Sequence, residues 1–95
     1  MGKYEIMYII SAELDDASRK AEMEKLHKIL TDDKAVISDV KEWGLREFAS
    51  PLSDLTKGYY VILKVTADTP CLEEFKRLAR LDNQVIRFLI TVDNQ

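Results

Sequence analysis

The fold of this chain is decided by Tyr59-Tyr60-Val61-Ile62-Leu63-Lys64-Val65, a segment rich in β-branched and aromatic residues. Residues of these types favour a β-strand. Successive side chains of a strand point to opposite faces of the sheet. We therefore expect a strand here, with Tyr59, Val61, Leu63 and Val65 on one face and the residues between them on the other.

The segment after this strand predicts a helix and then another strand. Thr69 is the expected N-cap, and Pro70 suits the first helical position because its missing N–H would have no partner there. Apolar residues continue at helical spacing as far as Leu81, namely Leu72, Phe75, Leu78 and Ala79. Asp82-Asn83-Gln84 ends the helix, and Val85 to Val92 is the last predicted strand.

The residues before Tyr59 predict the other half of the same arrangement. Tyr4 to Ile10 is an apolar run that favours a strand, and Asp16 to Thr31 has the spacing of an amphipathic helix. Val36 to Phe48 is predicted as a long, mostly polar strand, in which Gly44 indicates a bulge or bend. Turn residues from Ser50 to Gly58 predict a loop there.

The predicted order is strand, helix, strand, strand, helix, strand. Two right-handed crossovers of this kind place the first and third strands side by side at the centre. We therefore expect an α+β, ferredoxin-like βαββαβ sandwich in one domain, residues 1–95, with both helices on one face of a mainly antiparallel sheet. The expected core joins side chains of the first strand to side chains of both helices: Ile6, Tyr8, Ile10, Leu26, Leu30, Phe75 and Leu78.

The composition indicates a cytosolic domain. With 95 residues, of which 46% are hydrophobic, the chain can build one core but not a large buried active site as well. No apolar run approaches the roughly 18 residues of a membrane span, and no signal-peptide pattern is present. The net charge of -3 is unusual for a nucleic-acid binder. RNA binding would therefore need locally grouped basic residues, or a basic partner that shares the phosphates.

No residue pattern points to catalysis, a metal, a cofactor or a small-molecule substrate. His27 has no second ligand at helical spacing, and a metal site would need two or three more. Cys71, the one cysteine, excludes an internal disulfide and suits a small apolar filler. The acidic pairs lie at helix ends, where capping and solubility account for them: Asp15-Asp16, Asp32-Asp33 and Glu73-Glu74. We therefore expect no enzyme.

The predicted fold also occurs in the RNA-recognition motif, and one segment partly matches that motif. Lys57-Gly58-Tyr59 has the first three residues of its central strand signature. Val61 then stands where a base-stacking aromatic residue is needed, and Lys64 stands at the final aromatic position. We therefore interpret the match as coincidence.

Several segments resemble the bacterial small-subunit ribosomal protein family numbered six. Lys3 to Ile10 is similar to the opening strand of that family, and Trp43 to Leu52 is similar to its second-strand signature. Gly58-Tyr59-Tyr60 and Val85 to Ile90 match its third and fourth strands. The matches cover almost the whole chain at consistent spacing. Two departures are Ser50, where the family usually has Tyr, and Glu47, where a second basic residue is common.

The resemblance implies a structural ribosomal protein of the cytoplasm that takes part in translation and has neither catalytic activity nor a cofactor. Members of that family assemble with ribosomal protein eighteen, a small basic partner. The pair binds the central domain of small-subunit (16S) ribosomal RNA. Such a basic partner would complement the acidic charge of this chain.

The resemblance also suggests RNA-binding residues. Lys3, Arg46 and Arg87 carry positive charge in the matching strands, and Tyr4 would add a stacking or sugar contact. In the last strand, Ile86, Phe88 and Ile90 are expected to face the helices, which leaves Arg87 on the open side near the strand that carries Lys3.

The partner surface is expected at the long second strand and its bend, including Trp43 and Phe48. Core packing of Trp43, and simple solvation of Lys3 and Arg46, are the alternatives that the sequence leaves open. The alternative function is a non-ribosomal ferredoxin-like module that binds a small ligand or associates with itself.

Overall fold

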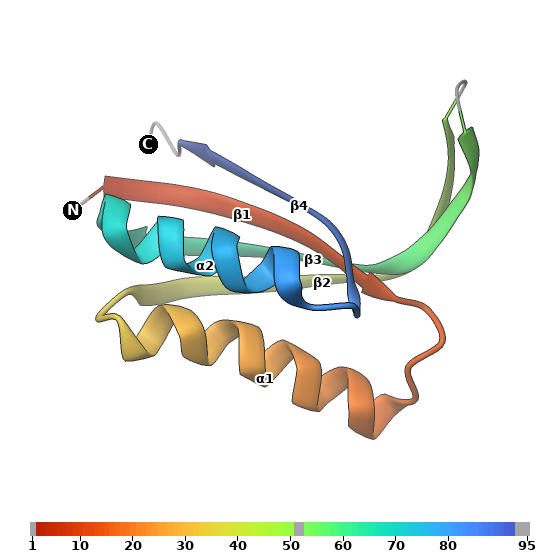
Figure 1. Ribbon diagram of the computed structural model, residues 1–95, viewed down its shortest axis with the longest axis horizontal. Coiled ribbons are helices and arrows are strands. Elements are labelled where there is room, and N and C mark those ends of the chain that lie inside the picture. The colour runs from red at the N-terminus through yellow and green to blue at the C-terminus, as the bar shows by residue number, and fades with distance from the viewer. Residues whose placement is uncertain (1, 51–52, 93–95) are drawn as a thin grey trace.

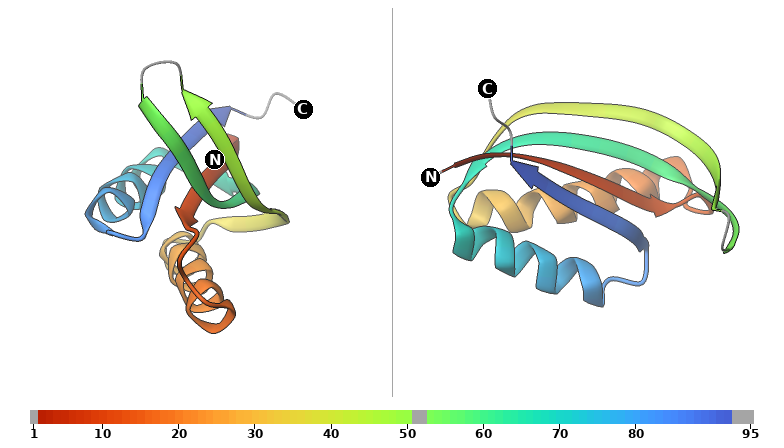
Figure 2. Two further views of the ribbon diagram at one scale, coloured as in Figure 1. Left: turned by 90° about the vertical axis from the view of Figure 1, so that its right-hand side faces the viewer. Right: turned by 90° about the horizontal axis from the view of Figure 1, so that it is seen from above.

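The computed structural model describes residues 2–50 and 53–92, and the side chains of these residues except at 48–50 and 53–56. Its elements follow the predicted order: β1 (Gly2–Ser11), α1 (Asp16–Asp32), β2 (Val36–Ser50), β3 (Ser53–Ala67), α2 (Thr69–Leu81) and β4 (Val85–Val92). The sheet order is β2-β3-β1-β4, and every neighbouring pair is antiparallel. Figures 1 and 2 show both helices on one face of the sheet. The predicted fold is confirmed.

The core lies between the central strands and the two helices. β1 contributes Ile6, Tyr8 and Ile10, none of which has measurable solvent exposure. They join Leu26 and Leu30 of α1, Phe75 of α2, and Val61, Leu63 and Val65 of β3 in one apolar cluster. Leu78 is the exception among the predicted core residues, because it is half-buried at the edge of the groove between α1 and α2.

The start of α2 corrects the predicted N-cap. Asp68, not Thr69, is the capping residue: its side-chain oxygen accepts a hydrogen bond of 3.2 Å from the backbone N–H of Cys71. Thr69 is the first helical residue, and Pro70 follows it. A carboxylate also interacts more favourably than a hydroxyl with the positive end of the helix dipole. α1 begins in the same way, since Asp15 accepts from the backbone N–H of Ser18 at 2.7 Å.

The loop predicted from Ser50 to Gly58 is wrong. β2 continues to Ser50 and β3 starts at Ser53, so that Phe48 pairs with Thr56 in a long hairpin. The pairing of β3 with β1 ends at Gly58, so the part of the hairpin between Arg46 and Gly58 extends past β1. Figure 1 shows this part curving away from the helices. The prediction of a loop rested on the turn residues of this segment. A two-stranded ribbon can still form there, because it is held by backbone hydrogen bonds and needs no apolar face.

The prediction that Ile86 of β4 faces the helices is wrong. Arg87 lies opposite Ile9, but the next pair along β1 is Ile10 with Val85, so Ile86 is an extra residue in a bulge. Val85 therefore packs against the core in place of Ile86, whose side chain is 46% exposed. A bulge shifts the alternation by one residue. Phe88 and Ile90 face the helices as predicted.

Candidate functional site

The face of the sheet opposite the helices holds most of the predicted site residues. Strand register places five basic residues of the described chain on it: Lys3, Lys41, Arg46, Lys64 and Arg87. Only three acidic residues accompany them, namely Glu5 and Asp39 on the face and Glu47 at its edge. The whole chain has a net charge of -3, so positive charge is concentrated on this open face.

A hollow of about 300 Å³ lies on the open face. Side chains from all four strands line it: Met7, Ile9, Trp43, Arg46, Glu47, Tyr60 and Arg87. Its floor is well packed, because Ile9 is 1% and Tyr60 9% exposed although no helix covers this side. The hollow brings together three residues that the sequence predicted separately, Trp43, Arg46 and Arg87.

A bulge in β2 turns Trp43 toward the hollow. Glu42 pairs with Val61 and Gly44 with Tyr60, so Trp43 is the extra residue between two ladder positions. Gly44 has a φ of 86°, in the left-handed region that favours glycine. Trp43 is 50% exposed, and the guanidinium carbon of Arg46 lies 5.5 Å from its ring centroid. The predicted bulge is present, and the indole is not a core residue.

Gly58 allows the floor of the hollow to close. A Cβ at this position would lie 2.3 Å from the Cγ2 methyl of Ile9 and 3.0 Å from the backbone oxygen of Ile10. The Cδ1 of the bulged Ile86 would lie 3.3 Å from the same Cβ. The absent side chain therefore leaves room for the side chains of Ile9 and Ile86 over Gly58.

Lys3 and Tyr4 lie away from the hollow. Lys3 is exposed on the open face but pairs with Thr66, six positions along β1 from Ile9, which is about 20 Å in a strand. Arg87 lies beside β1, the strand that carries Lys3, as predicted, but it pairs with Ile9 and not with the end of the strand that holds Lys3. Tyr4 points to the helix side, where it packs against the core. The side chain of Phe48 lies outside the described residues, so its predicted partner role stays a prediction.

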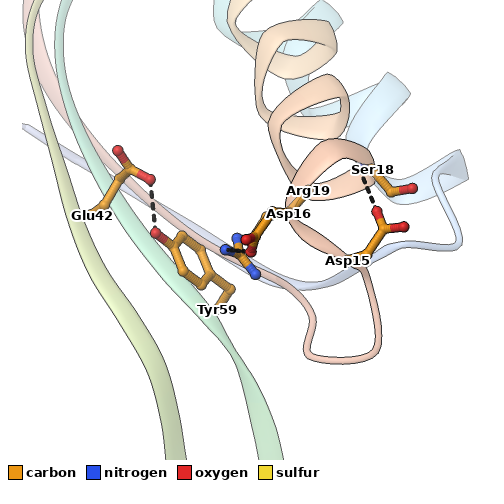
Figure 3. Close-up of polar contacts among 6 residues, drawn as sticks. All are labelled: Asp15, Asp16, Ser18, Arg19, Glu42 and Tyr59. Atoms are coloured by element: carbon orange, nitrogen blue, oxygen red, sulfur yellow. Dashed lines mark hydrogen bonds and ion pairs between the residues drawn. The ribbon is translucent and has the colours of Figure 1, made fainter.

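On the helix side of the sheet, next to the start of α1, β2 and β3 carry a polar network that the sequence did not suggest. Figure 3 shows Tyr59 between β2 and the start of α1, where its hydroxyl donates to Oε1 of Glu42 at 2.7 Å. The guanidinium of Arg19 lies 4.3 Å from the Tyr59 ring centroid and binds Asp16 at 2.6 Å. The hydrogen bond to Glu42 raises the pKa of Tyr59. This network ties α1 to the strand segment just before the Trp43 bulge.

The orientation of Tyr59 toward the helices argues against the RNA-recognition motif. In that motif, the signature strand presents its stacking rings on the open side of the sheet. Here Tyr59 packs against the core on the helix side, and Val61 is fully buried. The partial sequence match is therefore in the wrong register for base stacking.

The two buried polar sites beneath α1 are structural. His27 Nε2 lies 2.8 Å from the Tyr8 hydroxyl, and burial lowers the pKa of His27 against the opposing effect of Glu42. Glu22 is 8% exposed, and burial together with the neighbouring Asp82 carboxyl raises its pKa to about 7. Within residues 2–50 and 53–92, no group of three His, Cys, Asp or Glu side chains could hold a metal.

In the described part of the chain, neither helix is both long and apolar enough to cross a bilayer.

Comparisons with known proteins agree on one family. The model of the family described as Ribosomal protein S6 matches residues 3–91. The small ribosomal subunit proteins bS6 of Exiguobacterium sibiricum and Shouchella clausii are 39% and 43% identical to the chain over 95 residues, the whole of each sequence. The crystal structure of 30S ribosomal protein S6 from Thermotoga maritima superposes with a TM-score of 0.87 at 26% identity, covering 97% of this chain and 87% of that one. The chain therefore belongs to the ribosomal protein S6 family of the small ribosomal subunit.

Proposed function

We propose that this chain binds the central domain of 16S ribosomal RNA together with ribosomal protein eighteen, and that the open face of its sheet makes the RNA contact. The observation that carries this proposal is the grouping of positive charge on that face in an acidic chain. Arg46 and Arg87 flank the hollow from opposite edge strands, and Lys3 extends the basic surface along β1. Guanidinium groups suit phosphate because they can donate two parallel hydrogen bonds.

Membership of the family makes the chain a component of the cytoplasmic ribosome and removes the alternative of a non-ribosomal module. The proposed role is structural.

The outer edge of β2 is the proposed surface for ribosomal protein eighteen. β2 is an edge strand, and an unpaired strand edge offers backbone groups to another chain. Val40 and Leu45 are 42% and 56% exposed there, on the side of β2 away from Arg46 by register. The acidic excess of the chain outside the open face suits a small basic protein.

Reconstitution with a central-domain RNA fragment tests the proposal. Alone, the chain is expected to bind the fragment weakly because its net charge of -3 opposes phosphate approach. With ribosomal protein eighteen present, binding should become at least about tenfold tighter and should weaken as salt is raised. Filter binding at several salt concentrations measures both quantities. Tight binding without the partner, or none with it, would contradict the proposal.

Arg87→Ala is expected to weaken the assembled complex by about tenfold and to lower the salt slope by about one unit. The side chain is exposed on the open face, so the free energy of unfolding should change by about 0.5 kcal/mol or less. Arg77→Ala is the matched control, because it removes the same charge from an arginine of α2 that is 62% exposed and pairs with Glu74. Equal RNA binding by both variants would show that Arg87 is a solvated charge. Unfolding of the Arg87 variant would show a structural role.

A further inference from the structure

We propose that the hollow on the open face binds one unpaired nucleobase of a single-stranded RNA segment, with Trp43 as the stacking wall. This inference rests on the proposed function, in which the open face meets RNA. It adds a site for a base, whereas the proposed function needs only phosphate contacts.

The lining and the volume of the hollow suit an apolar-faced group. Met7, Ile9 and Tyr60 form its floor, and its volume of about 300 Å³ exceeds that of a single methyl or isopropyl group several times. Trp43 stands at its side with half of its surface exposed. A half-exposed indole beside an apolar floor has a large area to bury against a base, and base–aromatic stacking is tolerant of base identity.

The charges around the hollow favour an anionic ligand. Arg46 on β2 and Arg87 on β4 are separated by three strand spacings, about 14 Å between backbones, so they flank a bound base on two sides. The chain of phosphates that enters and leaves such a base would pass each guanidinium in turn. Glu47 is the one acidic residue of the lining, and Lys57 lies 3.8 Å from its carboxylate.

The same charges disfavour the basic partner protein in this position. A lysine- or arginine-rich segment entering the hollow would meet two guanidinium groups without an unpaired carboxylate to offset them. The predicted partner role of Trp43 and the base-stacking role are thus alternatives, and one experiment separates them.

Fluorescence of Trp43, the one tryptophan of the chain, reports directly on the hollow. The probes are a single-stranded uridine tetranucleotide and an abasic tetranucleotide with the same phosphates, titrated at low salt into the full chain. We expect saturable quenching by the uridine probe, with an affinity about tenfold higher than that of the abasic probe, because stacking adds to the phosphate contacts. Arg87→Ala should weaken binding of both probes, whereas Lys28→Ala, on α1, should weaken neither.

Two outcomes would overturn the inference, and a third would reject only the proposed function. Equal affinity for the two probes would mean that the face binds phosphate without a base. A change in fluorescence with ribosomal protein eighteen but not with the tetranucleotide would assign the hollow to the protein partner. Quenching by the uridine probe in a chain that fails to assemble on the central-domain fragment would leave the base site standing and reject the proposed function alone.

Discussion

Replacing Leu30 by alanine is expected to lower the free energy of unfolding by about 2–5 kcal/mol. Leu30 has no solvent exposure and lies in the cluster that joins α1 to β1, β3 and α2. The variant would lose the transfer free energy of the removed methyl groups and leave a cavity that the surrounding strands cannot close. A small domain has only about 5–15 kcal/mol of stability, so the loss is a large share of the total. Urea denaturation measures it.

Leu81→Ala is the matched control, because it makes the same chemical change at the end of α2 where the side chain is 69% exposed. We expect this variant to change stability by about 0.5 kcal/mol or less. A loss below about 1 kcal/mol for Leu30→Ala would mean that the buried face of α1 is assigned wrongly.

Glu22→Gln is expected to stabilise the protein by about 2 kcal/mol at pH 8 and to have little effect at pH 4. Burial and the neighbouring Asp82 raise the folded-state pKa of Glu22 from 4.5 to about 7. A raised pKa in the folded state contributes stability that is complete below about pH 4.5 and is lost as pH rises through about 7. Glutamine stays neutral at every pH, so the variant avoids that loss. Urea denaturation from pH 4 to pH 8 measures the difference between variant and wild type.

Comparing the variant with wild type at each pH removes the contributions of other groups. His27 has a lowered pKa and therefore contributes in the opposite direction, with stability lost as pH falls below about 6.5. The control Glu24→Gln removes the same charge from the exposed side of α1 and should change stability by about 0.5 kcal/mol or less. A difference between Glu22→Gln and wild type that stays constant with pH would show that the pKa of Glu22 is the same in the folded and unfolded states.

The fold was predictable because its signals are local and repeated. Each helix has apolar residues at helical spacing and an acidic cap close to the predicted start, and Val85–Val92 has the bounds that its composition indicated. The hairpin beyond Gly58 was not predictable in this way, because its pairing is made by backbone groups that every sequence possesses. The turn-forming residues there indicate a local preference for a loop. Pairing with the neighbouring strand overrides this preference.

The candidate site was predictable in part. The sequence identified Arg46, Arg87 and Trp43, but it could not show that they surround one hollow, because that depends on bulges at Trp43 and Ile86. One signal was available for the floor. β1 is apolar at both alternating sets of positions, which indicates a strand covered on both faces, and Met7 and Ile9 lie on the side without helices. The Arg19–Tyr59–Glu42 network joins distant segments and left no pattern in the sequence.

The position of β1 has a consequence for how the chain folds during its synthesis. β1 is made before both of its neighbours in the sheet: Gly2 pairs with Ala67, and Tyr4 pairs with Val92. Such distant pairings slow folding, since a long loop must close before they contribute. Until β4 leaves the ribosome, β1 therefore has one unpaired edge, and its core face stays uncovered by α2 until that helix forms. The nascent chain thus keeps an unpaired strand edge, which favours aggregation, until β4 has been made.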